Sequence, residues 1–164
     1  MSKTADVTVR PKRATDDAFV LGLSQRVFAA YSRDPLASMS SMLEEHGAEA
    51  SIAQIGRTRA GFVLLAYERL PRSFGPWQRP VVARLNAIAV RPDIEGRGIG
   101  RALLVAGEEM ARAAGAASFW LLTAENNLRA RRLFESAGFL PVVRSPTSYA
   151  RGQAGITMFK LLDL

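Results

Sequence analysis

The segment 90–101 carries the residues whose types and spacing are most distinctive of chemistry. Three glycines stand at alternate positions in it, namely Gly96, Gly98 and Gly100. Arg97 lies between the first two, and Arg101 follows the third. Glycine has no Cβ, so the backbone amides of such a loop can turn inward together. A helix that begins at the loop adds the positive end of its dipole. The segment therefore predicts an anion site suited to a pyrophosphate. The alternative, a flexible helix cap, needs fewer glycines than the three present.

Two common phosphate-binding motifs are absent from the sequence of this loop. A Walker loop requires Gly-Lys-Ser/Thr after four spacer residues, and the chain has none. The dinucleotide fingerprint G-x-G-x-x-G also fails. Its last position is Arg101 when counted from Gly96, and Leu103 when counted from Gly98.

Two motifs together resemble those of the GCN5-related N-acetyltransferases (GNAT). The first is Leu85-x-x-Ile88-x-Val90-x-Pro92, followed by Glu95-Gly96-Arg97-Gly98-Ile99-Gly100. The second is Asn127-x-x-Ala130-x-x-Leu133-Phe134-Glu135-x-x-Gly138-Phe139. Their order and separation also fit the family, and the resemblance covers nearly the whole chain.

The resemblance implies a fold and an acyl donor. We expect one domain over residues 1–164, of the α/β (α+β) class, with a mixed, mostly antiparallel central sheet flanked by helices. The sheet is expected to splay between its fourth and fifth strands. Acetyl-CoA is the implied acyl donor, with no metal. Its pantetheine arm would pair with the backbone of the strand residues Ile88, Ala89 and Val90. Its pyrophosphate would lie on the amides of Gly96, Arg97, Gly98, Ile99, Gly100 and Arg101.

Two residues of the second motif are also expected near the cofactor. Asn127 would contact it from the other side of the splay, and the same residue fits a plain helix N-cap. Phe134 stands where the family often has the tyrosine that protonates the departing thiolate. Phenylalanine has no proton to give.

Two further positions depart from the family pattern. Glu95 replaces the usual Arg or Gln at the start of the glycine motif, which weakens phosphate binding unless its side chain points to solvent. The family's catalytic glutamates would fall near Arg84 or Asn86 on one strand, or on Leu122 of the next, and none of these is a carboxylate.

The expected mechanism is therefore direct attack by a bound amine on the thioester. Three residues are the candidates for assisting it. Asn86 would order a water that carries the proton away, Glu68 is a distant base, and Tyr149 is a replacement acid. For Tyr149 the alternative is an ordinary surface aromatic. His46 follows two glutamates at a predicted helix end, where the helix dipole favours a cation, so we assign it no catalysis.

Hydrophobic periodicity and turn residues predict the other elements. Strands are expected over 7–10, 50–55, 62–66, 81–90, 117–122, 139–143 and 156–161, and helices over 15–28, 36–45, 101–114 and 126–137. The acceptor cleft is expected between Phe28, Tyr31 and the loops 31–41, 70–80 and 145–153. Phe74, Trp77 and Tyr149 are the aromatic residues available to it.

Composition limits the other classes of function. The chain has 164 residues, no cysteine, one histidine and a net charge of +7. Disulfides, thiolate metal sites and a cysteine nucleophile are excluded. The charge fits either solubility or a polyanion, but no nucleic-acid-binding signature accompanies it, so nucleic acid is not favoured. No signal peptide or apolar segment long enough to span a bilayer is visible, which predicts a cytoplasmic protein without a membrane partner. A homodimer is left open.

Two functions remain. The first is an acetyl-CoA-dependent N-acetyltransferase that modifies a primary amine on a peptide, polyamine or small molecule. The second is a non-catalytic regulator that binds acyl-CoA, which the missing tyrosine and carboxylates suggest.

Overall fold

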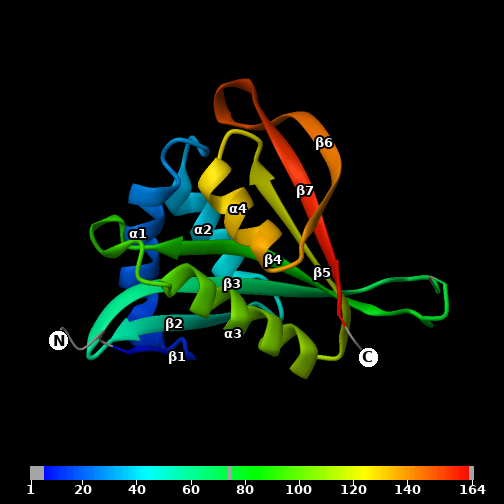
Figure 1. Cartoon of the computed structure of the whole chain (residues 1–164), viewed down its shortest axis with the longest axis horizontal. Helices are drawn as coiled ribbons and strands as arrows, with labels where there is room; N and C mark the ends of the chain where they lie inside the picture. The colour runs from blue at the N-terminus through cyan, green and yellow to red at the C-terminus, as the bar shows by residue number, and fades with distance from the viewer. Residues whose placement is uncertain (1–5, 74, 163–164) are drawn as a thin grey trace.

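A single mixed sheet of seven strands organises the chain, in the order β1-β2-β3-β4-β5-β7-β6. The computed structural model describes residues 6–73 and 75–162. The strands are β1 (Val7–Pro11), β2 (Glu49–Ile55), β3 (Thr58–Arg69), β4 (Val81–Val90), β5 (Ala116–Ala124), β6 (Leu140–Tyr149) and β7 (Gln153–Leu161). The helices are α1 (Asp17–Val27), α2 (Pro35–Glu44), α3 (Ile99–Ala113) and α4 (Leu128–Ser136). Figure 1 shows the path of the chain through these elements.

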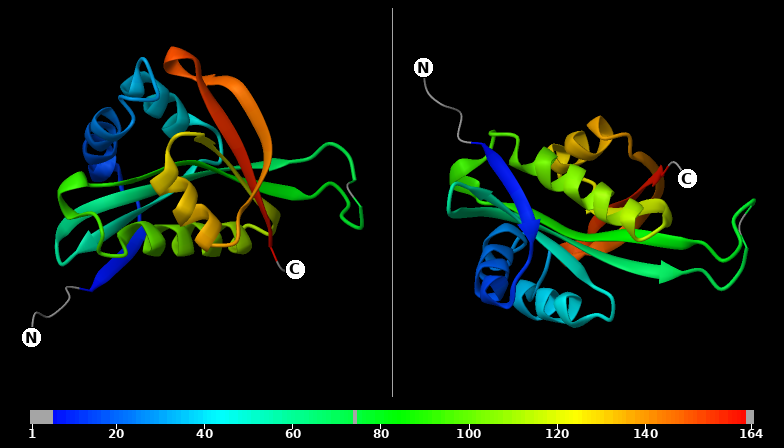
Figure 2. Two further views of the ribbon diagram at one scale, coloured as in Figure 1. Left: turned by 45° about the horizontal axis from the view of Figure 1, so that its top comes forward. Right: turned by 90° about the horizontal axis from the view of Figure 1, so that it is seen from below.

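The helices form two layers on opposite faces of the sheet. Helices α1 and α2 lie on one face, and α3 and α4 lie on the other (Figure 2). Strand β3 contributes side chains to both faces of the sheet, because successive side chains of a strand point to opposite faces. Phe62 and Leu64 pack in the cluster beneath α1 and α2, while Val63 and Leu65 pack in the cluster beneath α3. The continuous apolar run predicted from the sequence therefore reflects burial on both sides.

The side chains of strand β4 switch from one face of the sheet to the other at a bulge. Leu64 of β3 pairs with Ala87 and Leu65 pairs with Leu85, so Asn86 is the extra residue. Before the bulge, Leu85 packs toward α3; after it, Ala87 packs toward α1 and α2. A bulge of this kind re-aims the side chains that follow it.

The sheet opens between β4 and β5. These two strands are the parallel pair, and their register runs from Val81↔Ala116 to Leu85↔Leu121. Among the described residues, no pairing joins the remainder of β4 to β5. The predicted fold class, including the splay between the fourth and fifth strands, is thus confirmed.

One sequence-based boundary was wrong. The strand expected over 139–143 continues as β6 to Tyr149, although Pro146 lies inside it. Proline lacks the N–H that a ladder requires, so it is tolerated in edge strands and at bulges. Strand β6 is at the edge of the sheet, and its register against β7 shifts between Ser145 and Tyr149. Both conditions for a strand proline are met. The predicted loop shrinks to a short 3-10 turn at Ala150–Gly152.

Two other predicted elements have different bounds in the structure. Helix α3 begins at Ile99, two residues before the predicted start, because Gly98 already serves as its N-cap. Strands β3 and β4 extend into a long hairpin that projects from the sheet (Figure 1). Within the described part of the chain, no helix has both the length and the apolar character needed to cross a membrane.

A buried carboxylate ties β1, β3 and the start of α1 together. Asp16 has no exposed surface, and its carboxylate accepts hydrogen bonds from Arg10 at 2.7 Å and from Arg59 at 2.7 Å. Arg10 donates a second hydrogen bond at 2.9 Å, and the backbone N–H of Arg13 donates another, at 2.8 Å. The hydrogen bond from Arg10 is the largest of the causes that hold the pKa of Asp16 well below its usual range.

We predict that Asp16→Asn lowers the free energy of unfolding at pH 7 by about 2 kcal/mol, since removing one member of a buried ion pair is costly and the partners are partly exposed. A carboxylate with a lowered folded pKa stabilises the fold above its unfolded pKa and loses that contribution as pH falls. The difference between wild type and variant should therefore shrink below about pH 4. Urea unfolding at pH 7 and pH 3 measures it. An equal difference at both values would contradict the assignment.

Candidate active site

Two adjoining cavities occupy the opening between β4 and β5. The first, which we call the loop cavity, has a volume of about 330 Å³ and lies between β4, the glycine loop and α4. The second, the cleft cavity, has a volume of about 310 Å³ and lies between β4, β5, α2 and the tip of the β6–β7 hairpin. Four residues line both cavities, which are therefore continuous: Ile88, Asn127, Ala130 and Phe134.

Strand β4 forms one wall of the loop cavity. The backbone of this strand can form hydrogen bonds along that wall. Ile88, Ala89 and Val90 pair with β3 on one side, at Val63, Phe62 and Gly61. On their other side the paired part of β5 has already ended. Backbone N–H and C=O groups in a protein interior need partners. This edge can therefore receive an extended chain with amide groups, in the manner of an added strand.

The glycine loop has the geometry of an anion site. Gly96 has φ +81° and Gly98 has φ +77°, in the region that favours glycine. A Cβ built at either position meets no atom within 4 Å, so the space in front of the backbone is open. Gly98 is the N-cap of α3, whose positive dipole end faces this space.

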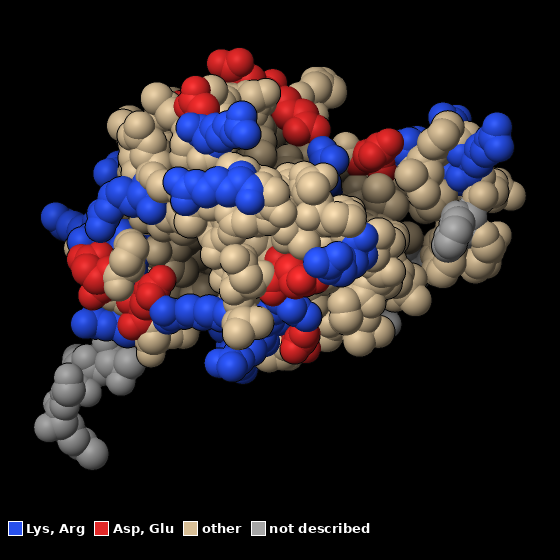
Figure 3. Space-filling model, turned by 90° about the horizontal axis from the view of Figure 1, so that it is seen from above, with Lys and Arg blue, Asp and Glu red and all other residues tan. Residues whose placement is uncertain are grey.

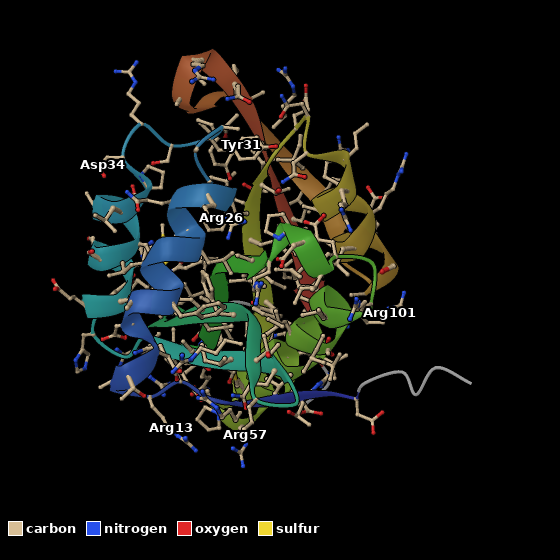
Figure 4. All side chains as sticks on the ribbon, turned by 90° about the vertical axis from the view of Figure 1, so that its left-hand side faces the viewer. Arg13, Arg26, Tyr31, Asp34, Arg57 and Arg101 are labelled. Carbon is tan, nitrogen blue, oxygen red and sulfur yellow. The ribbon has the colours of Figure 1, made fainter. Side chains whose placement is uncertain are left out.

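Most of the predicted loop residues line one cavity. The loop cavity is lined by Gly96, Gly98, Ile99, Gly100 and Arg101, together with the three β4 residues, Asn127 and Phe134. Arg97 does not line it. Figure 4 shows Arg101 on α3 and Arg26 on α1, and Arg26 lines neither cavity.

Glu95 also lines this cavity, but the structure gives it a partner. Its carboxylate forms an ion pair with Arg129 of α4, across the space between the loop and the helix. The pair neutralises the acid that departs from the family pattern. The ion pair also uses one terminal nitrogen of the Arg129 guanidinium.

Asn127 and Phe134 occupy the junction of the two cavities. The Asn127 side chain accepts a hydrogen bond from the N–H of Ala130 at 3.3 Å, so it is the N-cap of α4. Its contact with a cofactor stays a prediction. Phe134 is buried and meets Phe139 edge-to-face, with ring centroids 6.0 Å apart. Its ring therefore forms part of the wall that the two cavities share.

A carboxylate reaches the bulge of β4 from a distant part of the sequence. Glu45 follows the last residue of α2 and accepts hydrogen bonds from Arg84 and from Asn86, both at 3.3 Å. Arg84 also donates to the Asn86 side chain at 2.8 Å. We call these three residues the polar collar. Sequence analysis missed Glu45, since only the docking of α2 brings it to β4. The neighbouring His46 is exposed.

Tyr149 lies in the cleft cavity, beside Tyr31 from the segment that follows α1. The ring centroids are 5.9 Å apart, and the N–H of Ala150 donates to the carbonyl of Tyr31 at 3.2 Å. Figure 4 shows Tyr31 next to the tip of the β6–β7 hairpin. Burial, and then the proximity of Tyr31, raise the pKa of Tyr149 to about 12. Because a thiol has a pKa of about 8.5, this phenol is a poor proton source for a thiolate, and the role left to it is to donate a hydrogen bond.

Two expected parts of the site lie elsewhere. Glu68 and Trp77 do not line the cleft cavity; both line a separate groove on the sheet, beyond α2. The 70–80 segment lines this groove and not the cleft cavity, because the long β3–β4 hairpin carries it away from the opening. Phe74 lies outside the described residues. The other expected walls are present, with Phe28, Tyr31 and residues of the segments 31–41 and 145–153 lining the cleft cavity.

Charge is distributed rather than concentrated over the molecule. On the face seen in Figure 3, Lys and Arg side chains are interleaved with Asp and Glu and form no single stripe. In residues 6–73 and 75–162 no group of three or more His, Cys, Asp or Glu side chains is arranged to hold a metal ion.

Known proteins share this fold and this sequence pattern. Residues 18–139 match the acetyltransferase (GNAT) family. Arabidopsis thaliana NAA60, solved with acetyl-CoA, superposes with a TM-score of 0.81 at 15% identity, over 96% of this chain and 99% of that one. The Escherichia coli ribosomal-protein-S18-alanine N-acetyltransferase superposes with a TM-score of 0.72 at 22% identity, over 97% and 96%. The NatC complex bound to Gag peptide and CoA contains a chain that superposes with a TM-score of 0.81 at 14% identity, over 96% and 99%. No curated protein sequence matches the chain.

The match extends over more than half of the chain and includes both motifs and the splay. The protein therefore belongs to the GNAT acetyltransferase family.

We predict that Gly98→Val weakens binding of acetyl-CoA at least tenfold, which is about 1.4 kcal/mol. The added side chain would enter the open space before the loop and strain a positive φ. Gly47→Val is the matched control, because Gly47 has φ +78°, open space around its Cβ position and no place in either cavity. Calorimetry on both folded variants measures the affinity. Unchanged affinity for Gly98→Val would remove the loop from the cofactor site.

We predict that Glu95→Gln strengthens binding of acetyl-CoA by about threefold, the size of a partly exposed ion-pair effect. The change removes a negative charge beside the expected phosphates and releases Arg129. The gain should shrink in high salt, which screens exposed charges. Glu109→Gln, on the exposed side of α3, is the control for loss of one acid. Weaker binding by Glu95→Gln would show that the Glu95–Arg129 pair supports the site.

Proposed function

We propose that the protein is an N-acetyltransferase that moves the acetyl group of acetyl-CoA to a primary amine. One observation carries the proposal: the hydrogen-bonding edge of β4 runs from the glycine loop directly into the cleft cavity. A pantetheine arm bound along Ile88–Val90 would point its thioester at Asn86. The similar structures solved with acetyl-CoA or CoA and the family match support this donor.

The geometry supports direct transfer in one cavity. A neutral amine in the cleft cavity attacks the thioester carbonyl carbon, the new C–N bond forms, and the C–S bond breaks as the thiolate leaves. Holding the two reactants together can remove about 7–11 kcal/mol of the barrier in favourable cases. A backbone N–H of β4 near Ile88 would stabilise the oxyanion.

One side chain would assist the attacking amine, and another would assist the departing thiolate. Asn86, held by the polar collar, would orient the amine or a water that takes its proton. Tyr149 would donate a hydrogen bond to the departing sulfur, and solvent would then supply the proton. Glu68 lies in another groove, so a role for it would require action at a distance.

A non-catalytic acyl-CoA-binding regulator is the alternative, since Phe134 and Leu122 replace an acid and a base used elsewhere in the family. Release of CoA, measured against a library of amines, separates the two functions. CoA release with an amine, matched by acetylated product, supports the enzyme. Binding of acetyl-CoA without turnover of any amine supports the regulator.

We predict that kcat/KM follows the fraction of neutral amine, because no carboxylate or imidazole of the described residues lines the cleft cavity. For an alkyl amine with a pKa near 10 the rate should rise about tenfold per pH unit from pH 6 to 9.5. An α-amine should level off near pH 8, its own pKa. The profile is measured at saturating acetyl-CoA. A plateau well below the amine's pKa would reveal an enzyme group, and Glu45→Gln, Glu68→Gln and Tyr149→Phe would identify it.

A further inference from the structure

A second, larger depression adjoins the cleft cavity on the face of the sheet that carries α1 and α2. This sheet groove has a volume of about 780 Å³. It is lined mainly by apolar and aromatic side chains, among them Trp77, Val82, Trp120, Phe159 and Leu161. The rings of Trp120 and Phe159 are in contact, with centroids 4.5 Å apart and their planes tilted by 48°.

The groove and the cleft cavity lie end to end along the same two strands. On β4, Asn86 lines the cleft cavity while Arg84 and Val82 line the groove. On β5, Leu122 lines the cleft cavity while Trp120 lines the groove. Alternate residues of a strand face the same side and rise about 7 Å per pair, so the groove begins about 7 Å beyond Asn86.

The polar collar marks the boundary between these two apolar spaces. Glu45 offers carboxylate oxygens there, while Arg84 and Asn86 offer N–H groups. The Glu45 and Arg84 side chains are 42% and 57% exposed, so a bound molecule can reach them. A ligand that runs from one space to the other must therefore place hydrogen-bonding groups at the collar and apolar groups on either side.

We propose that the sheet groove binds the body of the acceptor, and that the acceptor is a peptide with bulky apolar side chains at its second or third position. This inference rests on the proposed function. A peptide unit supplies the C=O and N–H that the collar can pair. Two extended residues span about 7 Å, the distance from Asn86 to the groove. A polyamine fits less well, because Glu45 already pairs with Arg84 and the groove walls are apolar.

The groove is also an exposed apolar surface. Leu161 is 55% exposed and Val142 is 48% exposed. Helix α2 ends at Glu44, just before the groove begins, and α3 and α4 lie on the opposite face (Figure 2). Apolar surface of this extent generally marks a binding site.

Two tetrapeptide amides test the proposal, both beginning with alanine. One has leucine and phenylalanine at its second and third positions, and the other has serine at both. With saturating acetyl-CoA, we expect the apolar peptide to have a kcat/KM about tenfold higher than the serine peptide, the effect of one well-filled apolar subsite. Leu161→Arg should remove this preference, so that the two peptides have similar kcat/KM values. Val105→Arg, at a residue of α3 that is 54% exposed, is the matched control and should leave both peptides unchanged.

A binding measurement separates this inference from the proposed function. The two tryptophans of the chain, Trp77 and Trp120, both line the groove, so a peptide without tryptophan that enters it should change the intrinsic fluorescence. If the apolar peptide changes the fluorescence of wild type but not of Leu161→Arg, the groove binds peptide even where no turnover occurs. If both peptides are acetylated equally by wild type and Leu161→Arg, the proposed function stands and the groove inference is overturned.

Two other occupants would also overturn the inference. A dimer in sedimentation experiments that Leu161→Arg dissociates would show that a second copy covers the groove. The second occupant is a polyamine such as spermidine, if it changes the fluorescence in the same Leu161-dependent way and is acetylated faster than either peptide. That result would show that the acceptor in the groove is a polyamine and not a peptide.

Discussion

The separation of β4 from β5 after Leu85 is the constraint on which the site depends. A parallel pair normally satisfies the backbone of both strands along its whole length. Here the pairing covers only the first half of β4, so Ile88, Ala89 and Val90 keep one side of their backbone without a strand partner. A buried edge of this kind is costly unless another chain of amides covers it. The pantetheine arm of coenzyme A is such a chain, which relates the opening in the sheet to the donor of the family.

The bulge at Asn86 lets one strand serve both sides of this opening. Because it shifts the alternation, Leu85 faces the core beneath α3 while Ala87 faces the core beneath α1 and α2. It also marks the point at which the pairing with β5 ends. The same residue then belongs to the polar collar, so backbone irregularity and side-chain chemistry coincide where the acetyl group is expected.

Neutralisation of charge is a recurring feature around the site. Glu95 is paired with Arg129 beside the glycine loop, and Glu45 is paired with Arg84 at the collar. In both cases the two residues come from different elements, so the ion pair also bridges the walls of a cavity. Exposed pairs of this type contribute little to stability. Their consequence is local: they decide which charges a phosphate or an incoming amine meets.

The sequence alone determined the family motifs, the order of most elements and the position of the glycine loop, because these depend on local backbone chemistry. Positive φ at Gly98 and the N-cap at Asn127 are properties of a few consecutive residues. The tertiary structure decided what depends on contacts between distant segments. It extended β6 through Pro146, which its edge position and a register shift permit, and it carried Trp77 away from the cleft cavity on a projecting hairpin. It also brought Glu45 to Asn86, a contact across 41 residues that the sequence pattern does not reveal. Local rules place backbone turns, whereas packing of α2 against the sheet places the side chains that meet a substrate.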